Sequence, residues 1–263
     1  MNLAAVLRSA RSEGRTLLLP YLMAGVPTRE ATVDLFMAMA EAGADGFEVG
    51  IPYADPLMDG PVIEAAGRLA LSSGTTFGRG MELAAEVASR TGLPCVVMTY
   101  VNPILRRGYE RFCAEVAAAG LDGVIAADLP VDEAEPLAMA ARKAGVSLIP
   151  LVAPTTSAER IARAAALQPP FIYAVAELGV TGERAGPNER ASGLVARIRE
   201  VTDLPVGMGV GISTPEQARS AATMADAVIV GTAVVRRVLE AGSSREATRA
   251  VTDLVSSLRA AID

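Results

Sequence analysis

Two carboxylates stand eleven residues apart in the segment GFEVGIPYADPLMDGP, at positions 48 and 59. Glu48 lies inside an apolar run that is typical of a buried strand. Burial disfavours the charged form of a carboxyl and raises its pKa toward neutrality, where one group can both take and give a proton. The alternative is a buried ion pair, but the predicted strands contain no Arg or Lys to supply one. Glu48 is therefore a candidate acid and base catalyst.

Asp59 lies in the loop after this strand, in the sequence Asp-Gly-Pro. Asp and Pro at these positions are typical of a helix start, so composition alone favours a capping or turn role for Asp59. Asp55, which precedes Pro56, most simply shapes the same turn.

The residue types that are missing restrict the chemistry further. The chain has no His, which excludes Ser-His-Asp and Cys-His catalysis and imidazole metal sites. Cys95 and Cys113 have no CxxC partner, so we expect buried free thiols. Lys143 is the only lysine and lies at the polar end of a predicted helix, which does not suit a Schiff base. We therefore expect carboxylates, hydroxyls and backbone dipoles to act without a cofactor or a metal.

Composition also limits the partners and the compartment. The 263 residues carry a net charge of −6 without a basic run, which argues against nucleic-acid binding. The longest apolar run, Leu17 to Val26, is too short to span a bilayer. The N-terminal segment has the pattern of an amphipathic helix and lacks the apolar region of a signal peptide. We expect a cytoplasmic protein that does not bind membranes.

Short apolar runs alternate with Ala-rich amphipathic stretches along the chain. Eight runs are predicted as parallel strands covered by helices, at Leu17–Met23, Gly46–Ile51, Cys95–Tyr100, Gly123–Asp128, Ser147–Val152, Phe171–Val175, Val206–Gly209 and Ala227–Val230. The segments 41–52 and 118–130 repeat one pattern, in which a helix ends at Gly, Asp-Gly forms a turn and a strand ends at Pro. We predict a single (β/α)8 TIM barrel over residues 1–263, in preference to an open doubly wound sheet. An extra N-terminal helix should cap the barrel floor.

Glycines follow the last two predicted strands, in GMGVGIS at 207–213 and VGTA at 230–233. Such glycines serve packing and turns, but they also let a ligand approach the backbone and a helix N-terminus. Because barrels of this class commonly bind phosphate here, we predict a phosphate site. The long connection at 176–193 is either a lid over the barrel mouth, which Thr181 and Gly182 would reach, or a flexible surface loop.

The sequence resembles the tryptophan synthase alpha subunit family from about Leu3 to Leu239. The resemblance rests on YLMAGVPT at 21–28, EAGADGFEVGIPYADPLMDGPVI at 41–63, MTYVNPI at 98–104, AADLPVDE at 126–133, GVTG at 179–182, GVGIS at 209–213 and VGTAVV at 230–235. It implies a (β/α)8 barrel that cleaves indole-3-glycerol phosphate to indole and glyceraldehyde 3-phosphate in tryptophan biosynthesis. It also implies a pyridoxal-phosphate-dependent beta subunit as partner, in an alpha2-beta2 complex.

The resemblance assigns roles position by position. It implies that Glu48 is the acid and base catalyst and that Asp59 binds the indole. The phosphate-binding positions are Gly182, Gly211, Gly231 and Thr232, and the pocket-lining positions are Tyr21, Tyr100, Tyr173, Thr181 and Val210. Two alternatives stay open at this point: a stand-alone lyase that releases free indole, and a non-catalytic paralogue that activates a beta subunit. Retention of Glu48 and Asp59 argues against the second.

Overall fold

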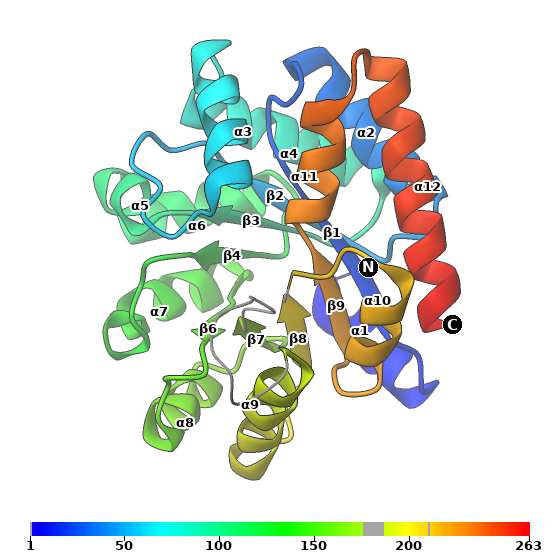
Figure 1. The fold of residues 1–263 in the computed structure, drawn as a ribbon. Coiled ribbons are helices and arrows are strands. Elements are labelled where there is room, and N and C mark those ends of the chain that lie inside the picture. The colour runs from blue at the N-terminus through cyan, green and yellow to red at the C-terminus, as the bar shows by residue number, and fades with distance from the viewer. Residues whose placement is uncertain (1, 176–186, 210) are drawn as a thin grey trace.

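The computed structural model describes residues 2–175, 187–209 and 211–263. Figure 1 shows strands in the middle of the molecule and helices outside them. The strands are β1 (Leu17–Met23), β2 (Phe47–Gly50), β3 (Cys95–Thr99), β4 (Gly123–Ala126), β5 (Ser147–Leu148), β6 (Leu151–Val152), β7 (Ile172–Val175), β8 (Val206–Gly209) and β9 (Ala227–Val230). They pair in parallel in the order β5-β4-β3-β2-β1-β9-β8-β7-β6. The predicted parallel barrel is confirmed.

The strand predicted at Ser147–Val152 is split into β5 and β6, which accounts for nine strands where eight were predicted. Pro150 lies in the break, and it has no N–H to donate to a ladder. The barrel nevertheless continues across the break. The Ile149 N–H donates to the Val124 carbonyl of β4, and the Pro150 carbonyl accepts the Tyr173 N–H of β7. The two short strands therefore occupy one position of an eight-position barrel.

Helices follow most of the strands and cover the outside of the barrel, apart from α1 at its N-terminal end. They are α1 (Leu3–Ser12), α2 (Arg29–Glu41), α3 (Pro61–Ser72), α4 (Phe77–Thr91), α5 (Val101–Arg107), α6 (Tyr109–Ala118), η1 (Val131–Glu133, a 3-10 turn), α7 (Glu135–Ala144), α8 (Ala158–Ala166), α9 (Pro187–Val201), α10 (Pro215–Ala222), α11 (Thr232–Glu240) and α12 (Ser244–Ile262). In the part of the chain that the structure describes, no helix is long and apolar enough to cross a membrane.

Three aspartates join neighbouring strands at their N-terminal ends. Asp45 and Asp122 belong to the two repeated Asp-Gly turns, and Asp226 occupies the equivalent place before β9. Each carboxylate accepts a backbone N–H at the start of an adjacent strand, at Leu18, Cys95 and Val206 respectively. The aspartate of each turn thus satisfies a donor that the strand ladder leaves unpaired.

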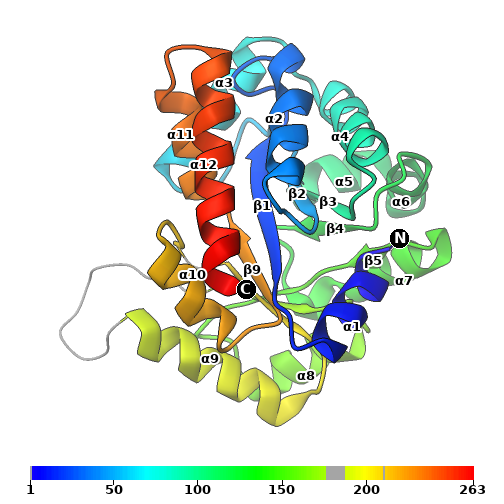
Figure 2. The same cartoon turned by 90° about the vertical axis from the view of Figure 1, so that its right-hand side faces the viewer.

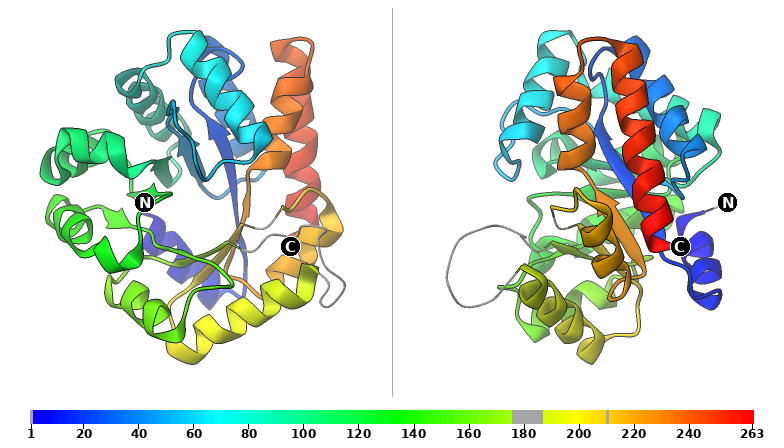
Figure 3. Two further views of the ribbon diagram at one scale, coloured as in Figure 1. Left: turned by 60° about the vertical axis from the view of Figure 1, so that its left-hand side comes forward. Right: turned by 45° about the vertical axis from the view of Figure 1, so that its right-hand side comes forward.

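Helix α1 closes the N-terminal end of the barrel, as predicted. Its side chains Leu3, Leu7 and Ala10 are buried in a core cluster with inward-facing strand residues such as Ile125 and Phe171. Figures 2 and 3 show α1 on the same side of the barrel as the C-terminal end of α12. With the floor closed, ligands can enter from the opposite end, where the carboxyl ends of the strands lie.

Candidate active site at the carboxyl ends of the strands

Glu48 projects into the barrel from β2, in register with Tyr21 of β1 and Val96 of β3. Its side chain is buried, with only 3% of the residue exposed. The Tyr173 hydroxyl donates to Glu48 Oε2 at 3.4 Å, and among the described residues no Arg or Lys forms an ion pair with Glu48. Burial raises the pKa of Glu48 to about 8; the Tyr173 hydrogen bond opposes this rise, and the charge of Asp59 adds to it. Glu48 can therefore exchange a proton near neutral pH.

Asp59 does not cap helix α3. The helix begins after Gly60 without a side-chain cap, so the simple capping role is wrong. Instead, the Tyr100 hydroxyl donates to Asp59 Oδ1 at 2.9 Å and accepts the Met58 N–H at 3.1 Å. Partial burial raises the pKa of Asp59, the Tyr100 hydrogen bond lowers it, and the negative charge of Glu64 raises it further. The carboxylate is held in place by a buried tyrosine from the end of β3.

Two tyrosines reach over glycines of neighbouring strands. The Tyr21 ring lies against Gly50, where an added Cβ would be 2.7 Å from Tyr21 Cζ. The Tyr173 ring lies in the same way against Gly209, with Cζ 2.8 Å from such a Cβ. Gly50 has no role among the sequence predictions, and Gly209 appears there only within the glycine segment expected to admit a ligand. A glycine inside a strand is the signal that could have indicated a close approach by another group.

Of the four candidate phosphate residues, Gly211, Gly231 and Thr232 lie after β8 and β9, which pair side by side. Gly211 adopts a left-handed backbone with φ of +51°. Gly231 is the N-cap of α11, and Thr232 is its first residue; the cap makes no side-chain hydrogen bond to the first turn, and N–H groups at such a helix start can bind an anion. Three predicted positions, Thr181, Gly182 and Val210, lie outside the described residues, as does most of the proposed lid at 176–193.

The remaining sequence prediction concerns the two thiols. Cys95 and Cys113 are free and buried, as predicted.

Tyr53, for which the sequence predicted no role, packs its ring on Tyr100 with centroids 5.2 Å apart. Its hydroxyl accepts from Asn102 Nδ2 at 3.0 Å, which ties the β2–α3 loop to α5. The loop that carries Asp59 is therefore held at both of these points.

A parallel barrel whose strand ends present two carboxylates, tyrosine hydroxyls and an uncapped helix N-terminus has the arrangement of a TIM-barrel enzyme. The family model of the tryptophan synthase alpha chain matches residues 7–263. The chain belongs to this family, and its function is that of a lyase in tryptophan biosynthesis.

Individual relatives agree with the family model. The tryptophan synthase alpha chain of Synechococcus elongatus is 46% identical over 254 residues, which cover 96% of this chain and 94% of the relative. That of Halorhodospira halophila is 44% identical over 263 residues, covering 100% and 96%. The solved alpha subunit from Legionella pneumophila superposes with a TM-score of 0.90 at 33% identity, covering 100% and 99% of the two chains. A tryptophan synthase structure from Mycobacterium tuberculosis gives 0.89 at 38%, covering 99% and 97%.

Proposed function

We propose that this chain cleaves indole-3-glycerol phosphate to indole and glyceraldehyde 3-phosphate, with Glu48 as the proton carrier. The observation that carries the proposal is a glutamate buried at the centre of the barrel, with a pKa of about 8 and no cationic partner among the described residues. Such a group is protonated in a large fraction of molecules at neutral pH and loses its proton readily.

The reaction needs two proton transfers at adjacent positions. Protonated Glu48 gives its proton to C3 of the indole ring, which leaves positive charge on the ring nitrogen. The Glu48 carboxylate then takes the proton of the side-chain hydroxyl next to the ring. The bond between C3 and the side chain breaks, the carbon that carried the hydroxyl becomes the aldehyde, and the electron pair returns to the ring to give indole. Glu48 ends protonated, ready for the next turnover.

Asp59 would stabilise the charge that forms on the indole nitrogen. Tyr100 holds Asp59 through Oδ1, so we assign Oδ2 as the acceptor of the indole N–H. This bond strengthens as C3 becomes tetrahedral and the nitrogen becomes positive, so it stabilises the transition state more than the ground state. Tyr21, Tyr100, Tyr173, Thr181 and Val210 would line the pocket around the ring.

The phosphate of the substrate would bind opposite, at Gly211, Gly231, Thr232 and Gly182. The uncapped first turn of α11 offers N–H donors and the positive end of a helix dipole. This mode of binding needs no lysine, in keeping with a chain whose single lysine lies in α7.

A beta subunit is the proposed partner, in an alpha2-beta2 complex. Leu57, Met58 and Leu105 are 77%, 62% and 53% exposed, and they lie on the loop and helix that the Tyr53–Asn102 bond joins beside the site. Exposed apolar side chains on neighbouring segments beside the site are suited to an interface. A subunit should release indole slowly alone and faster with a beta subunit, whereas a stand-alone lyase should be fast without one.

The proposal is tested by indole release from indole-3-glycerol phosphate with purified protein, with and without a beta subunit. Glu48→Gln should lower kcat by at least about 10²-fold, the usual contribution of a positioned acid or base. Asp59→Asn should lower it by about 10²- to 10³-fold, as loss of an electrostatic stabiliser does. Glu82→Gln, an exposed glutamate on α4, is the matched control. Unchanged indole release in Glu48→Gln would refute the proposal, and a fully folded protein without activity in any condition would favour the regulatory paralogue.

A further inference from the structure

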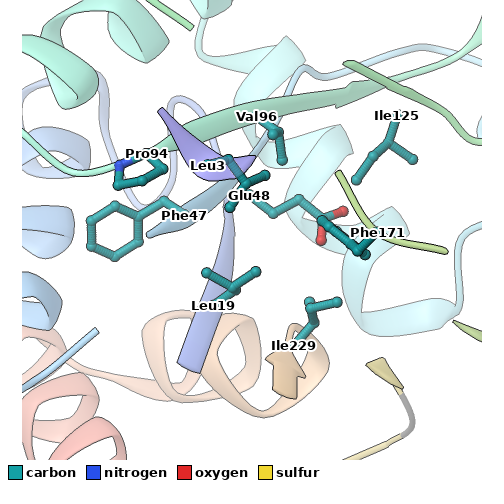
Figure 4. A pocket seen from close by; sticks show the side chains of 9 residues that line it. All are labelled: Leu3, Leu19, Phe47, Glu48, Pro94, Val96, Ile125, Phe171 and Ile229. Carbon is teal, nitrogen blue, oxygen red and sulfur yellow. The ribbon is translucent and has the colours of Figure 1, made fainter. Parts of the chain in front are cut away.

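A small cavity lies inside the barrel between Glu48 and the floor. Its volume is ≈ 10 Å³, and the residues lining it are Leu3, Leu19, Phe47, Glu48, Pro94, Val96, Ile125, Phe171 and Ile229. Figure 4 shows these side chains surrounding Glu48, whose carboxylate is directed toward the Phe171 ring. Among these described lining residues, only Glu48 has a polar side chain. The cavity thus adjoins the proton carrier on the side away from the barrel mouth.

The size and lining of the cavity indicate that it stays dry. A water molecule needs about 10–15 Å³ of such space and two to four polar partners. The volume is at the lower limit, and the lining side chains offer a single partner, the Glu48 carboxyl itself. A water placed there would lose more hydrogen bonds than it gained, so the cavity contributes to the desolvation of Glu48.

Leu3 is the residue that closes this space from below. It is the first residue of α1 and is 3% exposed. Its N–H donates to Asp122 Oδ1 at 3.0 Å, and the same carboxylate binds the start of β3 through the Cys95 N–H. The helix is therefore fixed to the strand layer at the point where Leu3 enters the barrel. Leu7, one turn further along α1, is 1% exposed in the same core cluster but does not line the cavity.

We propose that α1 is an apolar plug that keeps water away from Glu48 on its floor side, with Leu3 as a positioning residue for the acid and base chemistry. The inference rests on the proposed function, since it concerns the group assigned there as proton carrier. It gives the N-terminal helix a catalytic purpose: proton exchange at Glu48 is confined to the side on which the substrate binds.

Three other groups act on Glu48 through a hydrogen bond, their position or their charge. Tyr173 of β7 donates a hydrogen bond to it, Tyr21 of β1 lies beside it in register, and Asp59 acts on it through charge from the loop above. Burial is the largest cause of the raised pKa of Glu48, ahead of the Tyr173 bond and the Asp59 charge. Admitting water at the floor of the cavity would therefore reduce the burial of Glu48, while these three neighbours stay in place.

The test compares Leu3→Asn with Leu7→Asn. Each variant places an amide in the buried face of α1, but only the first places it in the cavity, where it gives a water molecule its second partner. The ionisation of Glu48 is followed without substrate by carbon-13 NMR of labelled glutamate carboxyls, with the Glu48 signal assigned by its loss in Glu48→Gln. We expect Leu3→Asn to lower the midpoint by about one pH unit, a tenfold change in proton affinity, and Leu7→Asn to leave it in place.

The pH profile of kcat/KM should shift in the same direction, because it reports the ionisation of the free enzyme. If Leu3→Asn does not fold, Leu3→Ser against Leu7→Ser makes the same comparison, since the shorter side chain leaves room for a water molecule and its hydroxyl is the second polar partner that the water needs. Equal midpoints in the Leu3 and Leu7 variants overturn the inference. The proposed function fails by a separate result, undiminished indole release in Glu48→Gln, so the two failures are distinguishable.

Discussion

Replacing Glu48 with glutamine should stabilise the folded state while it removes the proton carrier. Glutamine keeps the shape of the side chain and is uncharged at every pH, whereas Glu48 must either stay protonated in the barrel or carry a buried charge. Its pKa is about 8 in the folded protein, against an ordinary value of 4.5 that we assign to the unfolded chain. The difference is a contribution to stability that depends on pH.

The sign of this contribution depends on the pH at which the folded and the unfolded state release the Glu48 proton. Below pH 4.5 both states hold the proton, and Glu48 makes no pH-dependent contribution. Between 4.5 and about 8 the unfolded chain releases it while the folded protein retains it, so the free energy of unfolding falls as pH rises. At about 1.4 kcal/mol per pH unit, the loss is about 3 kcal/mol at pH 7 and about 5 kcal/mol above pH 8.

Urea unfolding of both proteins from pH 5 to pH 9 measures this difference. The free energy of unfolding of Glu48→Gln should be close to that of the parent protein at pH 5. The difference in favour of Glu48→Gln should then grow to about 5 kcal/mol near pH 9. Glu82→Gln, at an exposed position on α4, controls for the exchange of glutamate for glutamine. A constant difference across the pH range, or a less stable Glu48→Gln at pH 8, would refute the account of Glu48 as a desolvated acid.

Two further substitutions test the surroundings of the site. Tyr173→Phe removes a donor whose bond lowers the pKa of Glu48, so the midpoint of Glu48 should rise; at 3.4 Å the bond is long, and we expect about one pH unit at most, measured by carboxyl NMR. A downward shift would contradict the assignment. Gly50→Ala should displace the Tyr21 ring and reduce indole release by at least about tenfold, whereas Gly78→Ala, which has open space around it, should leave turnover unchanged.

The strands and helices could be predicted closely because their signals are local. The predicted bounds of Leu17–Met23, Val206–Gly209 and Ala227–Val230 agree with the structure. Each is a continuous apolar run between turn residues, and buried parallel strands leave such runs in the sequence. The split at Pro150 is also a local effect, because proline has no N–H to donate, and the predicted strand Ser147–Val152 did not take it into account.

The contacts within the site depend on register between strands, which no local pattern encodes. Tyr21 lies against Gly50 because β1 and β2 pair with Tyr21 opposite Glu48, two residues before the glycine. The Tyr100–Asp59 bond joins a strand end to a loop 41 positions away, so composition alone could not reject the capping role. The buried state of Glu48 could be predicted, but the identity of its hydrogen-bond donor could not.

The same strands connect the site to the floor of the barrel. Contacts at the floor can therefore offset the free-energy cost of burying the Glu48 carboxyl. The lower ends of β1, β3 and β8 are held by Asp45, Asp122 and Asp226, which fix the register that brings the inward side chains together. Arg259 of α12 is 13% exposed in its side chain and binds Asp45 Oδ2 at 2.9 Å, adding a buried bond at the same level. These contacts lie at the N-terminal ends of the strands, opposite the carboxyl ends where Tyr100 holds Asp59. They hold the strands on either side of Glu48, so the fold can tolerate the cost of a buried carboxyl at the position where the chemistry needs it.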